Sequence, residues 1–202
     1  RSFVLVSAAL SIVVISANSA FATIITFTGG SLSAGNSLGA GTPYVESGYT
    51  FSVSGGSANV NAASIQFADD FLVFTEPASI TLTGTGLGLS AFNLNFFNFG
   101  GTLAGNFTVT GNKTGGGAFA PLVLSADTTF KSASAIGWTD LSSVVFSTTS
   151  LGTGLKLGLD NVTVEAFTPA AVPEPATASI LGLGTMIGAF CQYRRRKRAA
   201  AT

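Results

Sequence analysis

Between residues 23 and 171 the chain consists of short runs in which apolar and polar residues alternate. At residues 92–96, for example, Phe92, Leu94 and Phe96 are separated by asparagines. This period of two places one set of side chains on each face of an extended strand, and runs rich in Val, Phe and Thr are typical of strands. The pattern predicts ten strands, at residues 23–28, 49–53, 64–67, 71–75, 79–83, 92–99, 106–110, 122–125, 143–147 and 155–167.

Turn residues separate these runs, and no stretch of the middle segment keeps a 3.6-residue apolar period over three turns. Glycine pairs or triplets stand at residues 29–30, 55–56, 100–101 and 115–117. About ten short strands at this spacing indicate an all-β protein with an antiparallel β-sandwich or jelly roll.

Two of the strands change the parity of their apolar residues. In the run from residue 155 to 167, Leu157 and Leu159 alternate cleanly, and Val162 and Val164 then carry the apolar pattern on the other parity. Residues 92–99 show a similar change. One extra residue near Asp160 and Asn161 would keep both halves facing the core, as a β-bulge does; alternatively, both faces of the strand are partly covered there.

The N-terminal segment has the pattern of a secretory signal. One basic residue, Arg1, precedes an apolar run, and the small residues Ala20 and Ala22 flank Phe21. This order predicts a signal helix over residues 1–22 with cleavage after Ala22. No initiator methionine precedes Arg1, so we expect the start of this signal to be truncated in the present sequence. A buried core element is the alternative interpretation.

A second apolar segment lies near the C-terminus. Residues 176–193 contain no formal charge, and 18 residues of helix are about 27 Å long, close to the ~30 Å hydrocarbon core of a bilayer. The basic run that follows predicts a stop to translocation with the C-terminus in the cytoplasm. Five residues make up this stop: Arg194, Arg195, Arg196, Lys197 and Arg198.

A proline-rich triplet precedes this apolar helix. Pro173 and Pro175 lack an N–H donor and disfavour helix in the residues before them, so the triplet should be extended and accessible. Together with Val172 and Glu174, the helix and the basic run, residues 172–198 resemble the PEP-CTERM sorting signal of exported bacterial proteins. A simple linker before an ordinary anchor helix is the alternative.

The resemblance implies several properties. The protein would be the substrate of an exosortase, a membrane protease-transpeptidase that recognises residues 172–175 and removes the helix. It would pass through the inner membrane as a single-span intermediate and then reach the cell surface or the extracellular matrix. Family membership also suggests a Gram-negative bacterium that makes an exopolysaccharide matrix, as in a biofilm. The segment around Leu159, Asp160 and Asn161 also resembles the closing strand of galactose-binding-like jelly rolls and of other PEP-CTERM ectodomains.

Charge and composition limit what the middle segment can do. Only 9% of the residues are charged, against about 25% in typical soluble domains. Residues 23–171 hold three basic and eight acidic residues, a net charge of −5, so they lack the basic cluster that nucleic-acid binding requires. The chain has no histidine, and Cys191, its single cysteine, lies in the C-terminal helix. These absences exclude Ser-His-Asp and Cys-His catalysis in the ectodomain.

Acidic residues are the remaining candidates for chemistry. Asp69, Asp70 and Glu76 form one local cluster, but neighbouring residues of a strand point to opposite faces. A two-carboxylate glycoside hydrolase is therefore the least favoured hypothesis, and we expect a solvated turn instead. A calcium ion, which takes six to eight oxygen ligands, is the one cofactor hypothesis. Its candidate ligands are Asp160, Glu46, Asp69 and Asp70.

Aromatic side chains could serve as a platform for sugar rings. Tyr44, Tyr49 and Trp138 are the amphipathic aromatic residues of the middle segment, and such rings have an apolar body with a polar handle. The alternative for Trp138 is a position at the rim of the core. The phenylalanines mostly alternate with polar residues and are expected in the core.

The sequence thus predicts an exported protein with a single β-sandwich ectodomain at residues 23–171 and no catalytic role. The first hypothesis is a structural or adhesive component of the cell surface or of an exopolysaccharide matrix. The second is a carbohydrate-binding module with a defined sugar site. The expected partners are an exosortase, the membrane and an extracellular polysaccharide, and no nucleic acid.

Overall fold

The computed structural model describes residues 21–39, 41–62, 69–75, 77–84, 91–148 and 155–169, together with Gly184 and Ile187. The chain divides into two compact units, residues 1–168 and 169–202. Several predicted features lie outside the described residues: the signal segment up to Ala20, the strand at residues 64–67, the sorting motif at 172–175 and the basic stop at 194–198. The same holds for the predicted span at 176–193 except at Gly184 and Ile187, which are helical. Within the described part, no helix is both long and apolar enough to cross a bilayer.

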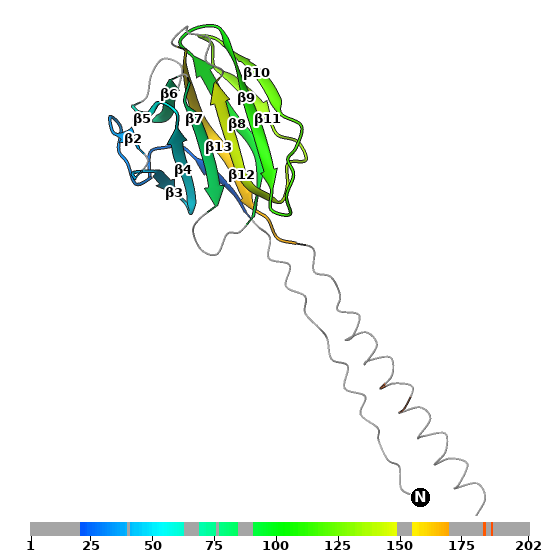
Figure 1. Cartoon of the computed structure of the whole chain (residues 1–202). Coiled ribbons are helices and arrows are strands. Elements are labelled where there is room, and N and C mark those ends of the chain that lie inside the picture. The colour runs from blue at the N-terminus through cyan, green and yellow to red at the C-terminus, as the bar shows by residue number, and fades with distance from the viewer. Residues whose placement is uncertain are drawn as a thin grey trace, which may run out of the picture. The chain divides into compact units, whose positions relative to one another are not determined.

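The first unit is built from strands alone within its described residues, and every strand pairing is antiparallel (Figure 1). Its strands are β1 (Ala22–Ile25), β2 (Ser37–Leu38), β3 (Tyr44–Glu46), β4 (Tyr49–Ser54), β5 (Ser57–Asn61), β6 (Phe71–Thr75), β7 (Ser79–Gly84), β8 (Phe92–Gly101), β9 (Gly105–Lys113), β10 (Leu122–Ala126), β11 (Lys131–Ser134), β12 (Leu141–Thr148) and β13 (Lys156–Ala166). The predicted all-β class is confirmed. Nine of the ten predicted strands are present, with ends shifted by at most three residues, and the tenth lies outside the described part.

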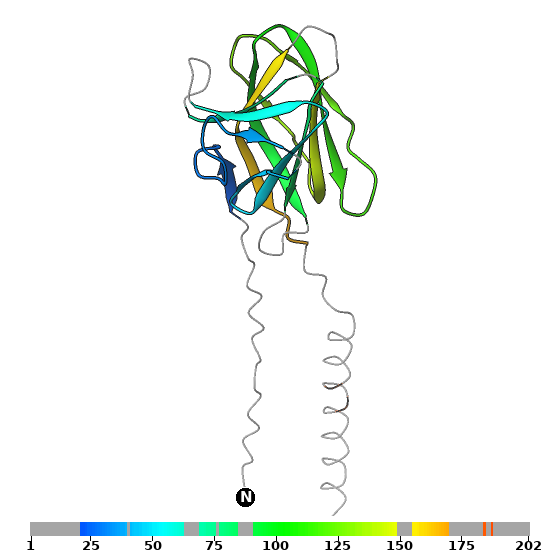
Figure 2. The ribbon, with the colours of Figure 1, turned by 60° about the vertical axis from the view of Figure 1, so that its left-hand side comes forward.

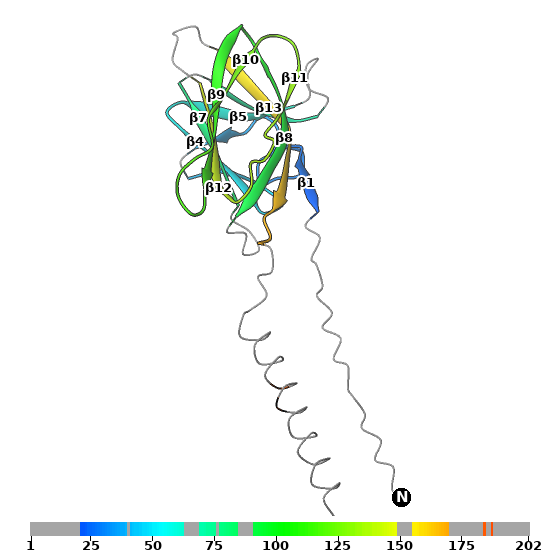
Figure 3. The same cartoon turned by 90° about the vertical axis from the view of Figure 1, so that its right-hand side faces the viewer.

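The strands form two layers joined along one edge. One path of hydrogen-bonded neighbours runs β2-β5-β6-β13-β8-β12-β7-β4-β3, but β8 and β12 share a single residue pair, Phe92 with Leu141. We therefore distinguish the β13 layer (β2, β5, β6, β13 and β8, with β1 and β11) from the β12 layer (β12, β7, β4 and β3, with β9 and β10). Figures 2 and 3 show these layers folded over each other as a nearly closed sandwich.

β13 carries the predicted bulge. Asp160 pairs with Asn98 of β8, and the next pair is Thr163 with Phe96. β13 therefore advances by three residues where β8 advances by two, and Asn161 within this step has the left-handed backbone angle φ of 48°. The bulge keeps one face of β13 in the core on both sides of the insertion. The fully buried side chains are Leu157, Leu159, Val162 and Val164.

β8 carries a second bulge one step further along. From the pair Thr163–Phe96 to the pair Val164–Leu94, β13 advances by one residue and β8 by two. The extra residue on each strand therefore compensates the other, and both strands change parity together. The buried side chains of β8 are Phe92, Leu94, Phe97 and Phe99. The opposite face is covered here as well, since Asn98 and Asp160 are only 7% and 1% exposed, so both sequence interpretations of the parity change hold.

The sequence pattern did not predict four of the observed strands: β2, β3, β5 and β11. They are short, and β5 and β11 place Ala, Asn, Ser or Lys at most positions, residues that do not favour strands by themselves. β5 pairs with β6 along its full length, and β11 pairs with β8. Their extended conformation therefore follows from a neighbouring strand rather than from local sequence.

Aromatic rings from the two layers meet in the core. Three pairs span the layers edge to face: Phe97–Phe146, Phe99–Phe107 and Tyr49–Phe92, with ring centroids 5.2, 5.0 and 5.7 Å apart. Such pairs stabilise a core beyond their buried area. They fix how the β13 layer sits on the β12 layer, and they confirm that these phenylalanines are core residues.

Replacement of Phe97 by alanine should lower the free energy of unfolding by about 3–5 kcal/mol. Phe97 is fully buried and its ring contacts Phe146 across the layers, so truncation leaves a cavity between them. The measurement is denaturant unfolding followed by the emission of Trp138, the single tryptophan of the chain. Phe130→Ala is the matched control because Phe130 is 44% exposed, and equal losses in the two variants would contradict the assignment of Phe97 to the core.

Candidate functional site

The three aromatic residues proposed for sugar binding lie in the core. Tyr44, Tyr49 and Trp138 are 0%, 2% and 6% exposed. A sugar can stack only on a ring that offers one face to solvent, so these three residues do not form the predicted platform. The sequence offered them as a platform because such rings combine an apolar body with a polar handle, whereas in this fold the rings are buried.

Trp138 occupies the rim of the core, the alternative that the sequence left open. Its indole stacks on Phe119 with centroids 5.5 Å apart and planes 11° apart, and the Lys113 ammonium lies 4.4 Å from the centroid of the Phe119 ring. Gly111 of β9 also lies so close to the indole that an added Cβ would be 2.6 Å from Trp138 Cε3. The tryptophan is therefore enclosed by β9 and by the Phe119 ring.

Glu46 connects the segment after β1 to β3. Its carboxylate accepts hydrogen bonds from the Phe27 N–H at 3.0 Å, the Thr26 N–H at 3.4 Å and the Tyr44 hydroxyl. Burial raises the pKa of Tyr44, and the hydrogen bond and charge of Glu46 raise it further, so the phenol stays a donor. Glu46 thus holds Phe27 in its left-handed conformation, with φ of 60°.

Asp160 lies at the β13 bulge. Its carboxylate accepts the backbone N–H of Asn161 at 2.7 Å and the Asn161 side-chain amide at 2.9 Å. Burial raises the pKa of Asp160 to about 6, the backbone hydrogen bond from Asn161 opposes this rise, and the charge of Asp69 adds to it. Asp160 and Asn161 together stabilise the unusual backbone of the bulge.

The predicted calcium ligands do not assemble. Asp69 is exposed and Asp70 half-buried just before β6, in agreement with the expected solvated turn. The charge of Asp69 raises the pKa of Asp160, and the charge of Asp70 raises the pKa of Tyr44. Glu46 accepts hydrogen bonds from backbone donors. Among the residues described, no three acidic, cysteine or histidine side chains come together as a metal site. The four candidate ligands therefore do not form a three-residue cluster within the described part of the chain, and a calcium ion stays a prediction.

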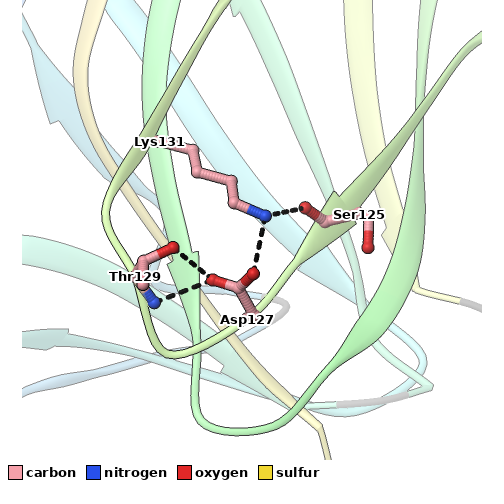
Figure 4. Close-up of polar contacts among 4 residues, drawn as sticks. All are labelled: Ser125, Asp127, Thr129 and Lys131. Carbon is pink, nitrogen blue, oxygen red and sulfur yellow. Dashed lines mark hydrogen bonds and ion pairs between the residues drawn. The ribbon is translucent and has the colours of Figure 1, made fainter.

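A charged cluster lies in the β10–β11 connection (Figure 4). The Lys131 ammonium donates to Asp127 Oδ2 at 2.8 Å and to the Ser125 carbonyl at 3.0 Å. Asp127 Oδ1 accepts the Thr129 N–H at 2.8 Å and the Thr129 hydroxyl. The hydrogen bond from Lys131 and those from Thr129 lower the pKa of Asp127 to about 2. These partners satisfy one another within the turn, and the cluster shapes the connection.

The outward side of the β12 layer carries rows of hydroxyl and amide side chains, which we name the hydroxyl face. Three rows cross β4, β7, β12 and β9: Thr50–Thr83–Ser143–Asn112, Ser52–Thr81–Val145–Thr110, and Ser54–Ser79–Ser147–Thr108. The intervening side chains point inward, as with the fully buried Leu82, Val144 and Phe146. The rows contain no formal charge, and Val145 is their single apolar member.

Several hydroxyls of this face remain available. Within the described part of the chain, the hydroxyls of Thr81, Thr83, Thr108 and Thr110 have no hydrogen-bond partner. Asn112 donates its side-chain amide to Ser143 Oγ at 2.9 Å. In the sequence, Ser or Thr alternates with apolar residues along β4, β7 and β9. Which residues of these strands lie side by side could not be predicted, because that depends on the strand register.

The strands β1 to β13, from Ala22 to Ala166, form what we call the β-body. Its two ends lie at one end of the β13 layer. Ala22, the first residue of β1, pairs with Glu165 near the end of β13, and the Phe167 N–H donates to the Ala91 carbonyl just beyond β13. Cleavage after Ala22, as expected from the sequence, would leave Thr23 to Ile25 paired with β13. The start of β1 and the end of β13 therefore lie beside each other.

The C-terminal segment is a PEP-CTERM protein-sorting motif: residues 171–197 match the family of that description. The chain thus carries a PEP-CTERM sorting motif at the place where its sequence resembled one. No curated protein matches the chain in sequence.

Solved structures of family 29 carbohydrate-binding modules resemble the β-body. One such module aligns with 78% of this chain and 97% of its own at 11% identity and a TM-score of 0.48. A variant solved in complex with mannohexaose aligns with 77% of this chain and 99% of its own at 10% identity and a TM-score of 0.48. At this level the likeness says nothing about a ligand of the present protein.

Replacement of Gly111 by alanine should lower the free energy of unfolding by about 1–3 kcal/mol, because overpacking forces neighbouring side chains to move. The new methyl group would meet Trp138 and Leu141 within 3.0 Å, so the emission spectrum of Trp138 should also shift. The control is Gly115→Ala, since a Cβ at Gly115 meets nothing within 4 Å. An unchanged spectrum in Gly111→Ala would place the indole elsewhere.

Asp160 should make the protein less stable as the pH rises from about 4 to 6. The native pKa, about 6, lies above the ordinary value of 3.8, so the unfolded chain releases its proton first and the free energy of unfolding falls across this window. The fall is on the order of 3 kcal/mol and is complete above pH 6. Denaturant unfolding at a series of pH values measures it, and Asp160→Asn should remove this part of the slope.

Asp127→Asn is the control for this experiment. The pKa of Asp127 is lowered to about 2, so its contribution is present above pH 3.8 and is lost as the pH falls toward 2. The slope between pH 4 and 6 should therefore persist in this variant. A slope that persists in Asp160→Asn as well would show that Asp160 is not the titrating group.

Proposed function

We propose that this protein is an exported, non-enzymatic component of the cell surface or of an exopolysaccharide matrix. The observation that carries the proposal is the sorting motif at residues 171–197, which follows shortly after β13 ends at Ala166. Residues 176–193 anchor the protein in the inner membrane, with residues 194–198 in the cytoplasm, until exosortase acts at residues 172–175. The β-body, within residues 23–171, is the part that works outside the cell.

The arrangement of the body's ends supports this processing. The first strand of the body begins at Ala22, beside Glu165 near the end of β13, so the proposed cleavage points lie at the first residue of β1 and beyond the last residue of β13 in sequence. Removal of both signals leaves the pairing of Thr23, Ile24 and Ile25 with β13 in place. The mature body therefore keeps the whole core after both segments are gone.

The chemistry of the body supports a role in binding or structure rather than catalysis. The chain has no histidine, and general acid–base chemistry would fall to its carboxylates. Glu46 and Asp160 are bonded to backbone and side-chain donors that hold local structure, and Asp127 is paired with Lys131. What the body offers to its surroundings is an uncharged hydrogen-bonding surface.

A carbohydrate-binding module is the second candidate, and the hydroxyl face is the observation that favours it. A defined sugar pocket built on Tyr44, Tyr49 or Trp138 is not part of this proposal, because those rings are buried. Binding would instead use polar groups of the outer surface. The two candidates differ in whether the surface recognises one polymer or contributes weakly to many.

The mass of the mature protein recovered from its natural host tests the proposed processing. Loss of residues up to Ala22 and loss of the segment after the Val172–Pro175 motif are expected, because both are signals rather than parts of the core. The matched control is a chain with Pro173, Glu174 and Pro175 all replaced by alanine, which should keep its C-terminal segment. A mature wild-type protein that still contains Cys191 would instead indicate a permanent anchor.

A further inference from the structure

We propose that the hydroxyl face binds long, uncharged polysaccharide chains through many weak hydrogen bonds. This inference rests on the proposed matrix function and names the surface and the class of polymer. The face consists of the three rows that cross β4, β7, β12 and β9. Eleven of its twelve positions carry a hydroxyl or an amide group, so hydrogen-bonding groups cover it almost without interruption.

The charge of the face selects an uncharged partner. None of the twelve positions is Lys, Arg, Asp or Glu, whereas phosphate- or carboxylate-bearing polymers are held by clustered cations. Lys113, next to Asn112 on β9, is directed to the ring of Phe119. A neutral polymer loses no ionic hydration on this surface, and its hydroxyls can both donate and accept.

The composition of the face disfavours a protein partner. Protein interfaces depend on a few buried aromatic, Arg or Met anchors, and the rows contain none of these. Val145 is the single apolar residue among them. A flat array of small polar groups offers no pocket for an anchor but many equivalent contacts for a chain of repeating units.

The geometry of the sheet supplies regular spacing. Neighbouring strands lie about 4.8 Å apart, and alternate residues of one strand about 6.8 Å apart, so the hydroxyls form a repeating grid. Thr81, Thr83, Thr108 and Thr110 carry hydroxyls without a partner in the described part. Threonine is stiff about χ1, so ordering these groups against a ligand costs little side-chain entropy.

The grid predicts that binding depends on the length of the polymer. A single hydrogen bond to a sugar replaces one to water and gains little, so a monosaccharide should bind poorly. When many units of one chain contact the grid together, each further contact is intramolecular and the total strength rises. Dissociation should therefore slow as the polymer lengthens.

Removal of hydroxyls from the central row tests the assignment. Thr81 and Thr110 flank Val145 in that row, and the double variant Thr81→Val, Thr110→Val keeps the β-branched shape while it removes two hydroxyls. The full chain, held in micelles of a sugar-free detergent, is applied to sensor tips that carry hydroxyethylcellulose, dextran or a galactomannan. Alginate serves as the charged polymer and glucose as the short competitor.

The matched control is Thr75→Val with Thr163→Val. Thr75 lies on β6 next to the buried Phe74, and Thr163 lies on β13 next to the buried Val164. Both strands belong to the β13 layer, so the chemical change is identical but lies outside the hydroxyl face. Trp138 emission and the denaturation midpoint show whether each variant is folded. We expect wild type and control to bind at least one uncharged polymer, and the face variant to bind it about tenfold more weakly.

The remaining outcomes overturn the inference in distinguishable ways. If the wild-type protein and the face variant bind an uncharged polymer equally well, the hydroxyl face is not the binding surface. The proposed matrix function would not be affected by that result. Equal losses in face and control variants would also exclude the face. Equal binding to alginate, or full competition by glucose, would contradict the polymer class. Wild type that binds none of the uncharged polymers would contradict sugar binding itself, while processing at Val172–Pro175 is tested separately by mass.

Discussion

The pairing of β8 with β13 is the constraint on which the rest of this structure depends. Each strand contains one extra residue, and the two bulges lie one step apart. Without both insertions, one half of each strand would turn its apolar side chains away from the core. Asp160 and Asn161 stabilise the β13 bulge through two hydrogen bonds. The buried carboxylate that carries this role is costly at neutral pH, which indicates that the geometry of the bulge outweighs the penalty of desolvation.

The core and the surface of the β-body divide the polar chemistry between them. Buried or half-buried polar groups such as Glu46, Tyr44 and Asp160 are bonded to partners that hold particular backbone conformations. The outward side of the β12 layer carries uncharged hydroxyls on a regular grid. This side of the body therefore offers a large, uncharged surface for hydrogen bonding.

The alternation of apolar and polar residues predicted some strands and side-chain positions correctly and others not. Alternation identified β6 at its exact bounds and located the β13 bulge, because both depend on nearest neighbours along one strand. It did not reveal β11, whose Ser and Lys residues favour no strand until β8 pairs with them. It also offered Tyr44, Tyr49 and Trp138 as a sugar platform, because the type of a residue does not show whether its polar atom has a partner in the core. The Tyr44 hydroxyl finds Glu46.

The sequence by itself determined the all-β class, the positions of the long strands and the sorting motif, since these follow from local alternation or from a contiguous stretch. Only the tertiary structure decided which distant residues meet. It buried Tyr44, Tyr49 and Trp138 in the core, and it aligned Thr81 with Thr110 across β12. The physical reason is that strand register is set by the packing of a shared core between layers, and no stretch of the chain contains that information alone.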